Sequence, residues 1–458
     1  MPFDALPELV ASSAATDGVR IPPDVTVPLT PRVRALIDTP EMRRLTRVSQ
    51  LGLVSLVYPG AVHSRFEHSL GVYRLAIEFL ARLRRDPVFF AVIDQSDAAA
   101  FVVAALLHDI GHWAFCHPLE DMGLAELPKH ETLSAHVLAH GAPARVLRDD
   151  WQLDPDRVAA LIGGTATDPA GVLLHSLLSG PIDVDKMDYL ARDSLHAGVP
   201  YGRHFDQERL LASLCVDGDG CSLAITDKGR TAAELMVFAR YVMFSEVYWH
   251  HAVRAATAML QRAVWTVRDR IDPETLTRTD DRAFIAWIGD VTVGTEAAPL
   301  VDGLFGDRRL LCKRVASFDA VNHPSIHRAL AGKTYAESTS IAALLADRLS
   351  SRLGTSVAAV TLLIDAPPAE REVEFKLQVR QGSRTAPGPR WKSLAELSPV
   401  VRSLAREQFD DLVKRVRIFA PAPVADAIAT LEDGILPDLE SAIAASRSSQ
   451  TTPPAHTT

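Results

Sequence analysis

The chain has only four cysteines among its 458 residues, and no two of them form a CxxC spacing. They are Cys116, Cys215, Cys221 and Cys312. Disulfides are rare in the cytosol, where cysteine is ordinarily found as the free thiol. The cysteine content therefore gives no sign of a disulfide framework, and we expect reduced thiols and a cytoplasmic location.

Long apolar segments are also missing. Nowhere in the sequence do about 18 apolar residues follow one another without interruption, so no membrane span is expected. The first residues, MPFDALPELVASS, contain neither a basic segment nor a continuous apolar core. They are therefore not expected to act as a secretory signal.

An excess of positive charge is absent as well. The formal net charge is −9, whereas proteins that coat DNA or RNA bind through basic patches that release counterions. A nucleic acid is therefore not expected as the main ligand. A polyanion would have to be bound by arginine and lysine side chains that are concentrated inside a pocket.

The remaining composition is that of a folded globular protein, with 47% hydrophobic and 23% charged residues. A chain of this length favours one large lobe with a smaller one. We expect a loose arm over 1–28, a helical catalytic core over 29–300, an α+β lobe over 301–445 and a disordered tail over 446–458.

Hydrophobic periodicity places helices in the expected core. Residues 97–110 are apolar nearly all round, which is typical of a helix at the centre of a bundle. Asp97 is a plausible N-cap for this helix and Gly111 a plausible stop. An amphipathic helix is expected over 66–84, and the longest helix over 229–268.

After residue 300 the pattern changes towards strands. Residues 357–365, VAAVTLLID, and 372–380, EVEFKLQVR, are rich in β-branched residues and are predicted to form a two-stranded element. Residues 413–420, VKRVRIFA, are a candidate third strand. The last helix is expected over 422–446.

Chemistry-bearing residues are concentrated in the helical region. His68, His108, Asp109 and Asp185 together offer two imidazoles and two carboxylates, a set suited to a first-row divalent metal ion. Adjacent residues on a helix point about 100° apart, so the pair at 108–109 can hold one ion only at a helix end or bend. A buried carboxylate needs a compensating cation; a structural ion pair is the alternative to a metal.

Three further histidines, His112, His117 and His130, crowd the same stretch. They could cap helices or face solvent, or they could contact a phosphate and transfer a proton. Glu120 follows His117 at a helical spacing that would let its carboxylate orient the imidazole. With a metal ion, such a set can catalyse hydrolysis.

These residues lie in strings that resemble the HD superfamily of metal-dependent phosphohydrolases, in its dNTP triphosphohydrolase branch. The resemblance covers about residues 30–270. The matching strings are SQLG (49–52), YPGAVHSRFEHSLGV (58–72), HDIGHWAFCH (108–117), KHE (129–131) and IDVDKMDYLARD (182–193). The resemblance implies a mainly α fold, an HD-domain helical bundle with a smaller α+β C-terminal lobe. It also implies hydrolysis of a dNTP to the deoxynucleoside and triphosphate.

The resemblance further implies a role for each matching residue. The metal ligands would be His68, His108, Asp109 and Asp185. Arg65, Lys186 and Arg240 would bind the triphosphate, and His112 the α-phosphate. His117, with His130 and Glu120, would be the acid/base group. Gln50, Leu51 and Asp193 would contact the deoxyribose and its 3′-hydroxyl, Tyr189 would pack under the sugar, and Tyr248 would fill the space of a 2′-hydroxyl.

The implied cofactor is a divalent transition metal (Mn, Fe, Zn, Co or Ni), with Mg²⁺ on the nucleotide phosphates as a further candidate. The implied partners are a dNTP and further copies of the chain in a homo-oligomer. Trp249, His250 and His251 depart from the family pattern, so base preference stays open. Two alternatives remain: an HD phosphohydrolase for nucleoside monophosphates or another phosphoester, and a non-catalytic nucleotide sensor.

Overall fold

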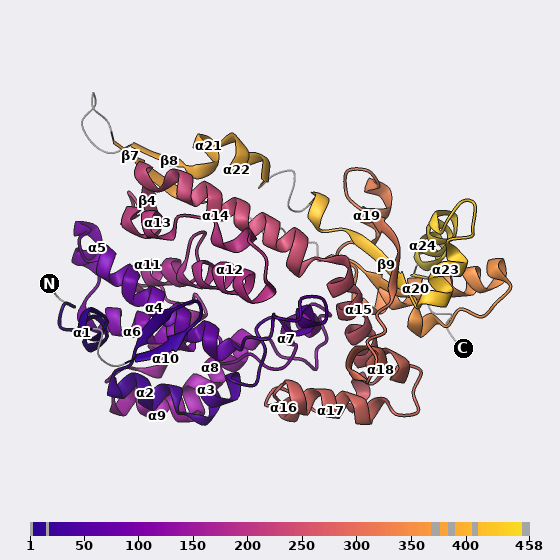
Figure 1. Cartoon of the computed structure of the whole chain (residues 1–458), viewed down its shortest axis with the longest axis horizontal. Helices are drawn as coiled ribbons and strands as arrows, with labels where there is room; N and C mark the ends of the chain where they lie inside the picture. The colour runs from indigo at the N-terminus through magenta and orange to yellow at the C-terminus, as the bar shows by residue number, and fades with distance from the viewer. Residues whose placement is uncertain (1–2, 15–17, 368–375, 383–389, 405–410, 451–458) are drawn as a thin grey trace, which may run out of the picture.

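The computed structural model describes all residues except 1–2, 15–17, 368–375, 383–389, 405–410 and 451–458 (Figure 1). The helices up to residue 200 are α1 (Pro7–Ala14), α2 (Pro31–Ile37), α3 (Pro40–Leu45), α4 (Arg65–Leu83), α5 (Pro87–Val92), α6 (Gln95–Leu107), α7 (Cys116–Glu120), α8 (His130–His140), α9 (Ala142–Asp149), α10 (Pro155–Ile162), α11 (Pro169–Leu178) and α12 (Val184–Ala197). The later ones are α13 (Gln207–Ser213), α14 (Arg230–Met243), α15 (His251–Thr266), α16 (Pro273–Leu276), α17 (Asp281–Thr292), α18 (Ala298–Phe305), α19 (Pro324–Leu330), α20 (Tyr335–Leu353), α21 (Leu394–Leu397), α22 (Pro399–Ser403), α23 (Ala422–Ile428) and α24 (Leu436–Gln450). The fold is therefore mainly α, as predicted.

The strands are short and form three small sheets. They are β1 (Gly18–Ile21), β2 (Val25–Pro28), β3 (Leu214–Val216), β4 (Leu223–Thr226), β5 (Lys313–Phe318), β6 (Leu363–Asp365), β7 (Gln378–Gln381), β8 (Arg390–Ser393) and β9 (Val416–Ala420). The sheet orders are β1-β2, β3-β4-β7-β8 and β5-β9-β6. In the part of the chain that the structure describes, no helix is long and apolar enough to cross a bilayer.

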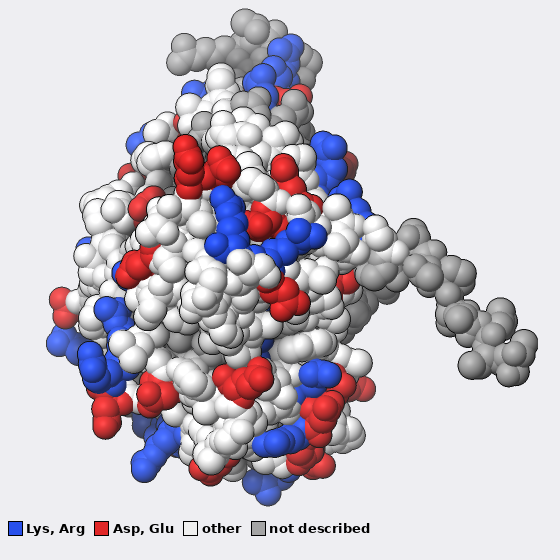
Figure 2. Space-filling model, turned by 90° about the vertical axis from the view of Figure 1, so that its right-hand side faces the viewer, with Lys and Arg blue, Asp and Glu red and all other residues white. Residues whose placement is uncertain are grey.

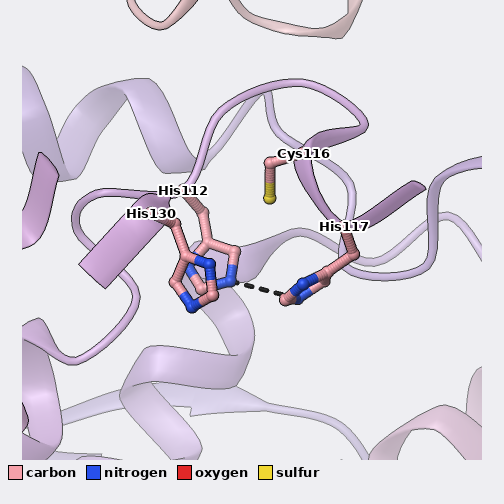
Figure 3. A group of neighbouring side chains, drawn as sticks. All are labelled: His112, Cys116, His117 and His130. Atoms are coloured by element: carbon pink, nitrogen blue, oxygen red, sulfur yellow. Dashed lines mark hydrogen bonds between the residues drawn. The ribbon is translucent and has the colours of Figure 1, made fainter. Parts of the chain in front are cut away.

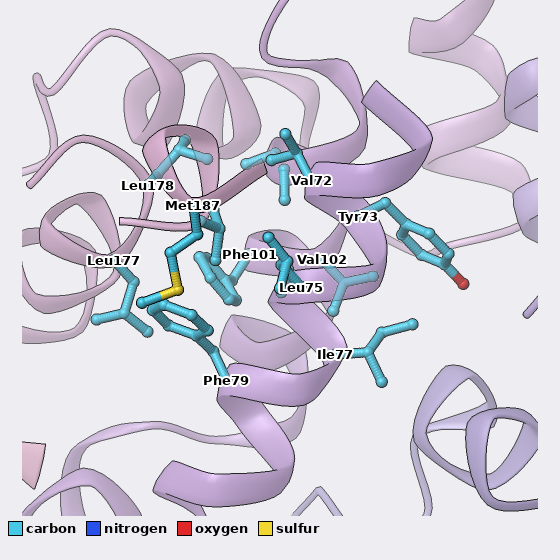
Figure 4. Close-up of a cluster of buried hydrophobic side chains, with 14 of the residues drawn as sticks. Val72, Tyr73, Leu75, Ile77, Phe79, Phe101, Val102, Leu177, Leu178 and Met187 are labelled. Atoms are coloured by element: carbon cyan, nitrogen blue, oxygen red, sulfur yellow. The ribbon is translucent and has the colours of Figure 1, made fainter. Parts of the chain in front are cut away.

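Helix α6 lies at the centre of the first bundle, packed against α4, α10 and α11. Every residue from Ala98 to Leu107 is buried, which explains why the helix is apolar on all sides. Figure 4 shows Phe101 and Val102 of α6 among Phe79 of α4 and Leu177 of α11. This apolar packing holds the ends of α4 and α6 in fixed positions.

The predicted bounds of this central helix differ from the observed ones. Asp94 is the N-cap, and Asp97 is the third residue of a capping box with it. The helix ends at Leu107, with His108 as its C-cap. Gly111 is therefore not the stop; instead it allows a close approach of α8, because a Cβ there would lie 2.2 Å from the carbonyl oxygen of His130.

The N-terminal segment is not a loose arm. It forms α1 and the β1–β2 hairpin, and Phe3 and Leu6 are fully or almost fully buried. The carboxylate of Glu8 is buried too, and it accepts hydrogen bonds from the Thr30 hydroxyl over 2.7 Å and from Arg32 Nε over 2.9 Å. The N-terminal segment is therefore fixed to the core in two ways. Its apolar side chains are buried there, and its buried carboxylate is paired with an arginine of α2.

The predicted long helix over 229–268 is in fact interrupted. Helix α14 continues into a π-helical segment, η4 (Phe244–Tyr248), and α15 starts only at His251. His250 has a non-helical backbone, and its side chain accepts a hydrogen bond from the amide of Ala252 over 3.3 Å. Wide π turns within helices are frequent at functional sites, and this one carries Tyr248.

The strand prediction was correct in part. A strand occurs at β9, but the two expected partner strands lie in different sheets. β6 pairs antiparallel with β9, whereas β7 lies parallel to β4 and antiparallel to β8. The first part of the predicted strand over 372–380, residues 372–375, lies outside the described residues.

The C-terminal part contributes to three apolar cores. Leu377, Val379 and Leu394 pack into the same apolar core as the first bundle, so the chain returns there after residue 376. A separate core lies between the β5-β9-β6 sheet and helices α20 and α24. A single boundary at residue 300 does not describe this arrangement.

The end of the chain also differs from expectation. The predicted helix over 422–446 is two helices, α23 and α24, and Gly434 between them has a left-handed backbone with a φ of 61°. Helix α24 continues to Gln450, inside the expected tail. The last eight residues, 451–458, lie outside the described part.

Candidate active site

Three helix ends converge beside the apolar core. Helix α4 begins at Arg65, one turn before His68, and its first turn is capped by the side chain of Ser64. Helix α6 ends at His108. Helix α12 begins beside Asp185, capped by the side chain of Asp183. These ends bring residues from distant parts of the sequence to one place.

All four expected metal ligands meet there. The Nε2 atoms of His68 and His108 are 3.2 Å apart. Asp185 Oδ1 lies 3.0 Å from Nε2 of His68 and 3.7 Å from Nε2 of His108. Asp109 Oδ1 lies 3.3 Å from Nε2 of His108. Donor atoms on adjacent positions of one ion, each about 2.1 Å from it, are separated by roughly 3.0–3.4 Å.

The chemistry of the donor set also fits a cation. His68 Nδ1 is bonded to Asp188 Oδ2 over 2.9 Å, and His108 Nδ1 to the carbonyl oxygen of Ala105 over 2.9 Å. Because both Nδ1 atoms act as donors, Nε2 is the ring atom of each histidine that is left to hold a proton or a metal ion. Burial acts to lower the pKa of His68. The hydrogen bonds to Asp185 and Asp188 outweigh burial and raise this pKa to about 10. The place between these groups therefore attracts positive charge.

Arg65 contacts the four expected metal ligands through Asp109. Its Nη1 donates to Asp109 Oδ2 over 2.9 Å, and its Nε is buried without a hydrogen-bond partner. Burial raises the pKa of Asp109, but His112, His108 and Arg65 together hold it well below the ordinary range. Asp109 is therefore ionised and oriented.

The second group of histidines adjoins the first. His112 Nδ1 lies 3.1 Å from Asp109 Oδ1, and His112 Nε2 lies 3.2 Å from His117 Nε2. Glu120 accepts hydrogen bonds from the backbone amide of His130 over 2.7 Å and bonds its Nδ1 over 3.0 Å. The same carboxylate is 3.8 Å from His117 Nδ1. Glu120 thus orients mainly His130, rather than His117 as its spacing suggested.

Two adjoining cavities open at this site. One, of about 500 Å³, is lined by the four expected metal ligands and the three histidines. The other, of about 470 Å³, is lined by aromatic and aliphatic side chains, among them Leu51, Phe244 and Tyr248. Gln50, Arg65 and His117 line both. A polar end thus leads into an apolar one.

The two remaining basic residues differ in their partners. Lys186 Nζ donates to Asp183 Oδ2 over 2.7 Å, so its charge is already paired. Arg240 makes no ion pair with any carboxylate of the described residues, and its Nε is buried without a partner. Burial raises the pKa of Tyr189 to about 12, while Arg240 and Lys186 act to lower it. Arg240, whose guanidinium lies 5.5 Å from the centroid of the Phe244 ring, is therefore a cation near Tyr189 that has no carboxylate partner among the described residues.

The residues expected to contact the sugar also meet. The Tyr248 hydroxyl donates to Asp193 Oδ2 over 2.6 Å, and the rings of Tyr189 and Tyr248 lie edge to face with centroids 6.4 Å apart. Gln50 Oε1 is buried without a hydrogen-bond partner. This cluster has an unused acceptor that a bound molecule could satisfy.

Several supporting residues were missed by sequence reasoning. Asp188 bonds His68, and Arg192 is bonded to both oxygens of Asp188 and to Glu67. His63 Nε2 bonds Asp193 Oδ1 over 2.8 Å. Asp188 and Arg192 stand four residues apart in a string already singled out, and that helical spacing was the available signal.

Gly71 makes the contact between α4 and α12 possible. A Cβ at this position would lie 2.0 Å from Asp188 Oδ1 and 2.3 Å from Arg192 Nη2. The absence of a side chain therefore lets the buried ion pair approach α4 closely enough for Asp188 to reach His68.

Comparison with known proteins identifies the family of the chain. The HD domain model matches residues 65–193, and the model of the HD associated region matches residues 205–440, more than half of the chain. A protein of Aquifex aeolicus described as hypothetical has the same fold, with a TM-score of 0.68 and 25% identity over 90% of this chain and 98% of that one.

Two curated relatives show the range of similarity. Uncharacterized protein YwfO of Bacillus subtilis is 38% identical over 229 residues, which are 50% of each chain. Deoxynucleoside triphosphate triphosphohydrolase SAMHD1 of Gallus gallus is 30% identical over 266 residues, 51% of this chain and 42% of that protein. The chain spans about half the length of the curated relatives it matches. It belongs to the HD superfamily of phosphohydrolases, as a member in which an HD domain is followed by an HD associated region.

Proposed function

We propose that the protein is a metal-dependent dNTP triphosphohydrolase, which converts a dNTP and water to a deoxynucleoside and triphosphate. The observation that carries the proposal is that the two cavities adjoin and share Gln50, Arg65 and His117 in their walls. The polar cavity holds the His68–His108–Asp109–Asp185 group, and the apolar cavity beside it holds Tyr248 and other aromatic side chains. This arrangement offers one end to phosphates and the other to a nucleoside.

The four ligands would hold one divalent ion, which when bound supplies Lewis-acid stabilisation at the α-phosphate. Arg65, fixed by its bond to Asp109, and Arg240, which has no carboxylate partner among the described residues, would bind phosphate oxygens. Lys186 would join them from the start of α12. The cofactor is a transition metal such as Mn, Fe, Zn, Co or Ni, with Mg²⁺ on the outer phosphates.

The second histidine group would move the proton. The His117 side chain is 55% exposed and lines both cavities, so it can reach the 5′-oxygen that leaves. His130, held by Glu120, lies beside it with ring centroids 5.1 Å apart. His112, close to Asp109, would contact the α-phosphate.

Selection of the sugar would depend on the cluster around Asp193. Its carboxylate would accept a hydrogen bond from the 3′-hydroxyl, and Gln50 and Leu51 would also contact the sugar. Tyr189 would pack under the ring, and Tyr248 would occupy the space of a 2′-hydroxyl. Removing a polar or steric element of such a site weakens discrimination.

The net charge of −9 and the mixed charges of one face (Figure 2) favour a small-molecule substrate over a nucleic acid. Figure 2 shows lysine and arginine interspersed with aspartate and glutamate over the face it displays. Of the basic residues of the proposed function, Arg65 lines both cavities. The protein is further proposed to be a cytoplasmic homo-oligomer, which light scattering of the purified chain and localisation in cells would test.

The test is product identity. The purified full chain is incubated with Mn²⁺ and each dNTP in turn, with the Asp109→Ala variant as the inactive control. Deoxynucleoside plus triphosphate is the expected result. Monophosphate with pyrophosphate, or hydrolysis only of another phosphoester, would indicate the other HD phosphohydrolase class. Nucleotide binding without any product would indicate a sensor.

A further inference from the structure

A second group of metal-binding side chains lies beside the first. We propose that His112, Cys116, His117 and His130 form a separate site for zinc or a similar borderline-soft ion. One nitrogen or sulfur donor from each residue lies within 4.8 Å of the donors of the other three. Figure 3 shows the thiol and the imidazoles directed towards a common space.

The distances suit a tetrahedral ion. The Nε2 atoms of His112 and His117 are 3.2 Å apart. Two nitrogens at about 2.0–2.1 Å from a tetrahedral zinc ion are separated by roughly 3.3 Å. Two neutral imidazoles can join these atoms by a hydrogen bond only if one nitrogen carries the proton. A metal ion instead accepts the lone pairs of both.

The other ring nitrogens have carboxylate neighbours. His130 Nδ1 is bonded to Glu120 Oε2 over 3.0 Å, and His112 Nδ1 lies 3.1 Å from Asp109 Oδ1. Histidine ligands of metals commonly donate their second nitrogen to a carboxylate, which orients the ring and makes it a better ligand. The His130 ring already has that arrangement, whereas His112 Nδ1 lies close to the Asp109 carboxylate without forming a hydrogen bond to it.

Cys116 separates this site chemically from the first. The thiol is buried at the start of α7, next to His117, whose half-exposed ring provides a route for an ion from the cavity. Thiolate ligands favour zinc and copper over magnesium and manganese. The His68–His108–Asp109–Asp185 group contains no sulfur. On binding, the thiol proton passes to solvent and a metal–sulfur bond forms.

An ion at the second site would inhibit turnover. This consequence rests on the proposed function, because the nitrogens that the ion occupies belong to His112 and His117. Neither could then contact the phosphate or give a proton to the leaving oxygen. The ion in the first centre would stay in place, so inhibition by zinc would not be reversed by more Mn²⁺.

The test uses cobalt as the probe on the metal-free full chain. Wild type is expected to bind two Co²⁺ ions, one of them with the thiolate-to-cobalt charge-transfer absorption that zinc then abolishes. The Cys116→Ser variant should lose that absorption and one ion. The Cys221→Ser variant, changed at an exposed cysteine in the loop between β3 and β4, should retain both.

Two further variants keep the test decisive if Cys116→Ser does not fold. His130→Gln should weaken cobalt binding at the sulfur-containing site by about tenfold or more, and His68→Ala should remove only the ion without sulfur. In turnover assays, the zinc concentration that halves the rate should rise by about tenfold in Cys116→Ser. A charge-transfer band that is missing in wild type, or that persists in Cys116→Ser, would overturn the second site. The cobalt measurement uses no nucleotide, so failure of the proposed hydrolysis would leave its result unchanged.

Discussion

The hydroxyl of Tyr248 donates a 2.6 Å hydrogen bond to one carboxylate oxygen of Asp193, while His63 Nε2 holds the other oxygen over 2.8 Å. Tyr248 comes from the π-helical segment, where it lines the apolar cavity, and Asp193 comes from α12, which contributes Asp185 and Tyr189 to the wall of the polar cavity. The carboxylate is 2% exposed and fully oriented. A sugar hydroxyl that reaches it meets a preorganised acceptor.

Changes at Tyr248 should therefore alter sugar selection. Tyr248→Phe keeps the ring and removes the bond, and we expect KM for the dNTP to rise about tenfold, since one hydrogen bond to a charged group contributes about 1.5–3 kcal/mol. Tyr248→Ala also opens space, so the dNTP/NTP ratio of kcat/KM should fall. Steady-state kinetics with paired deoxy- and ribonucleotides measure both effects. An unchanged ratio in the alanine variant would remove Tyr248 from this role.

Asp188 is expected to set metal affinity without touching the ion. Its carboxylate orients His68 and is itself held by Arg192. Asp188→Asn should weaken metal binding by about 10–100-fold, as other losses of such supporting contacts do. Competition with a chelator measures the change.

Asp154→Asn is a matched control for this substitution. Asp154 caps α10, and asparagine caps a helix equally well. We expect wild-type metal affinity in this variant. Equal affinity in Asp188→Asn would show that the bond to His68 has no effect on the ion.

Arg240 and Lys186 should respond differently to alanine. Arg240 has no ion-pair partner among the described residues, so Arg240→Ala should raise KM about 10–100-fold, with little change in thermal stability. Lys186 neutralises Asp183, which is fully buried. Lys186→Ala should therefore also destabilise the protein by about 1–3 kcal/mol, because a buried carboxylate loses its partner. Thermal unfolding and kinetics on both variants separate the effects; equal loss of stability would contradict the assignment.

The central helix should dominate stability. Phe101 on α6 is fully buried, whereas Phe90 on α5 is 40% exposed. Phe101→Ala is expected to destabilise the protein by about 3–5 kcal/mol through lost burial and a cavity. Phe90→Ala is the matched control and should cost about 1 kcal/mol or less. Denaturant titration compares them, and similar midpoints would mean that α6 is not central.

The local sequence pattern predicted the helical class and the groups of the site, for physical reasons. An all-round apolar run such as 97–110 has only one stable location, inside a bundle. A carboxylate next to a histidine at the end of that run, as at Asp109, requires a cation. These constraints act within a few residues and are therefore visible in the sequence.

Features that depend on distant partners were not predictable in the same way. The partner of β7 is β4, more than 150 residues earlier, and nothing near residue 378 specifies it. The burial of Phe3 likewise depends on Phe89, whose ring lies 6.0 Å from it. The helix is interrupted directly after Tyr248, because Trp249 and His250 have non-helical backbones. The sequence around them has helical periodicity and gave no sign of this interruption.

The central claim is that His68, His108, Asp109 and Asp185 hold one ion. Anomalous diffraction from crystals of the full chain soaked in Mn²⁺ tests it most directly. We predict one strong peak within coordination distance of Nε2 of both His68 and His108, and its loss in crystals of His108→Ala. A peak elsewhere, with none between these two nitrogens, would contradict the account.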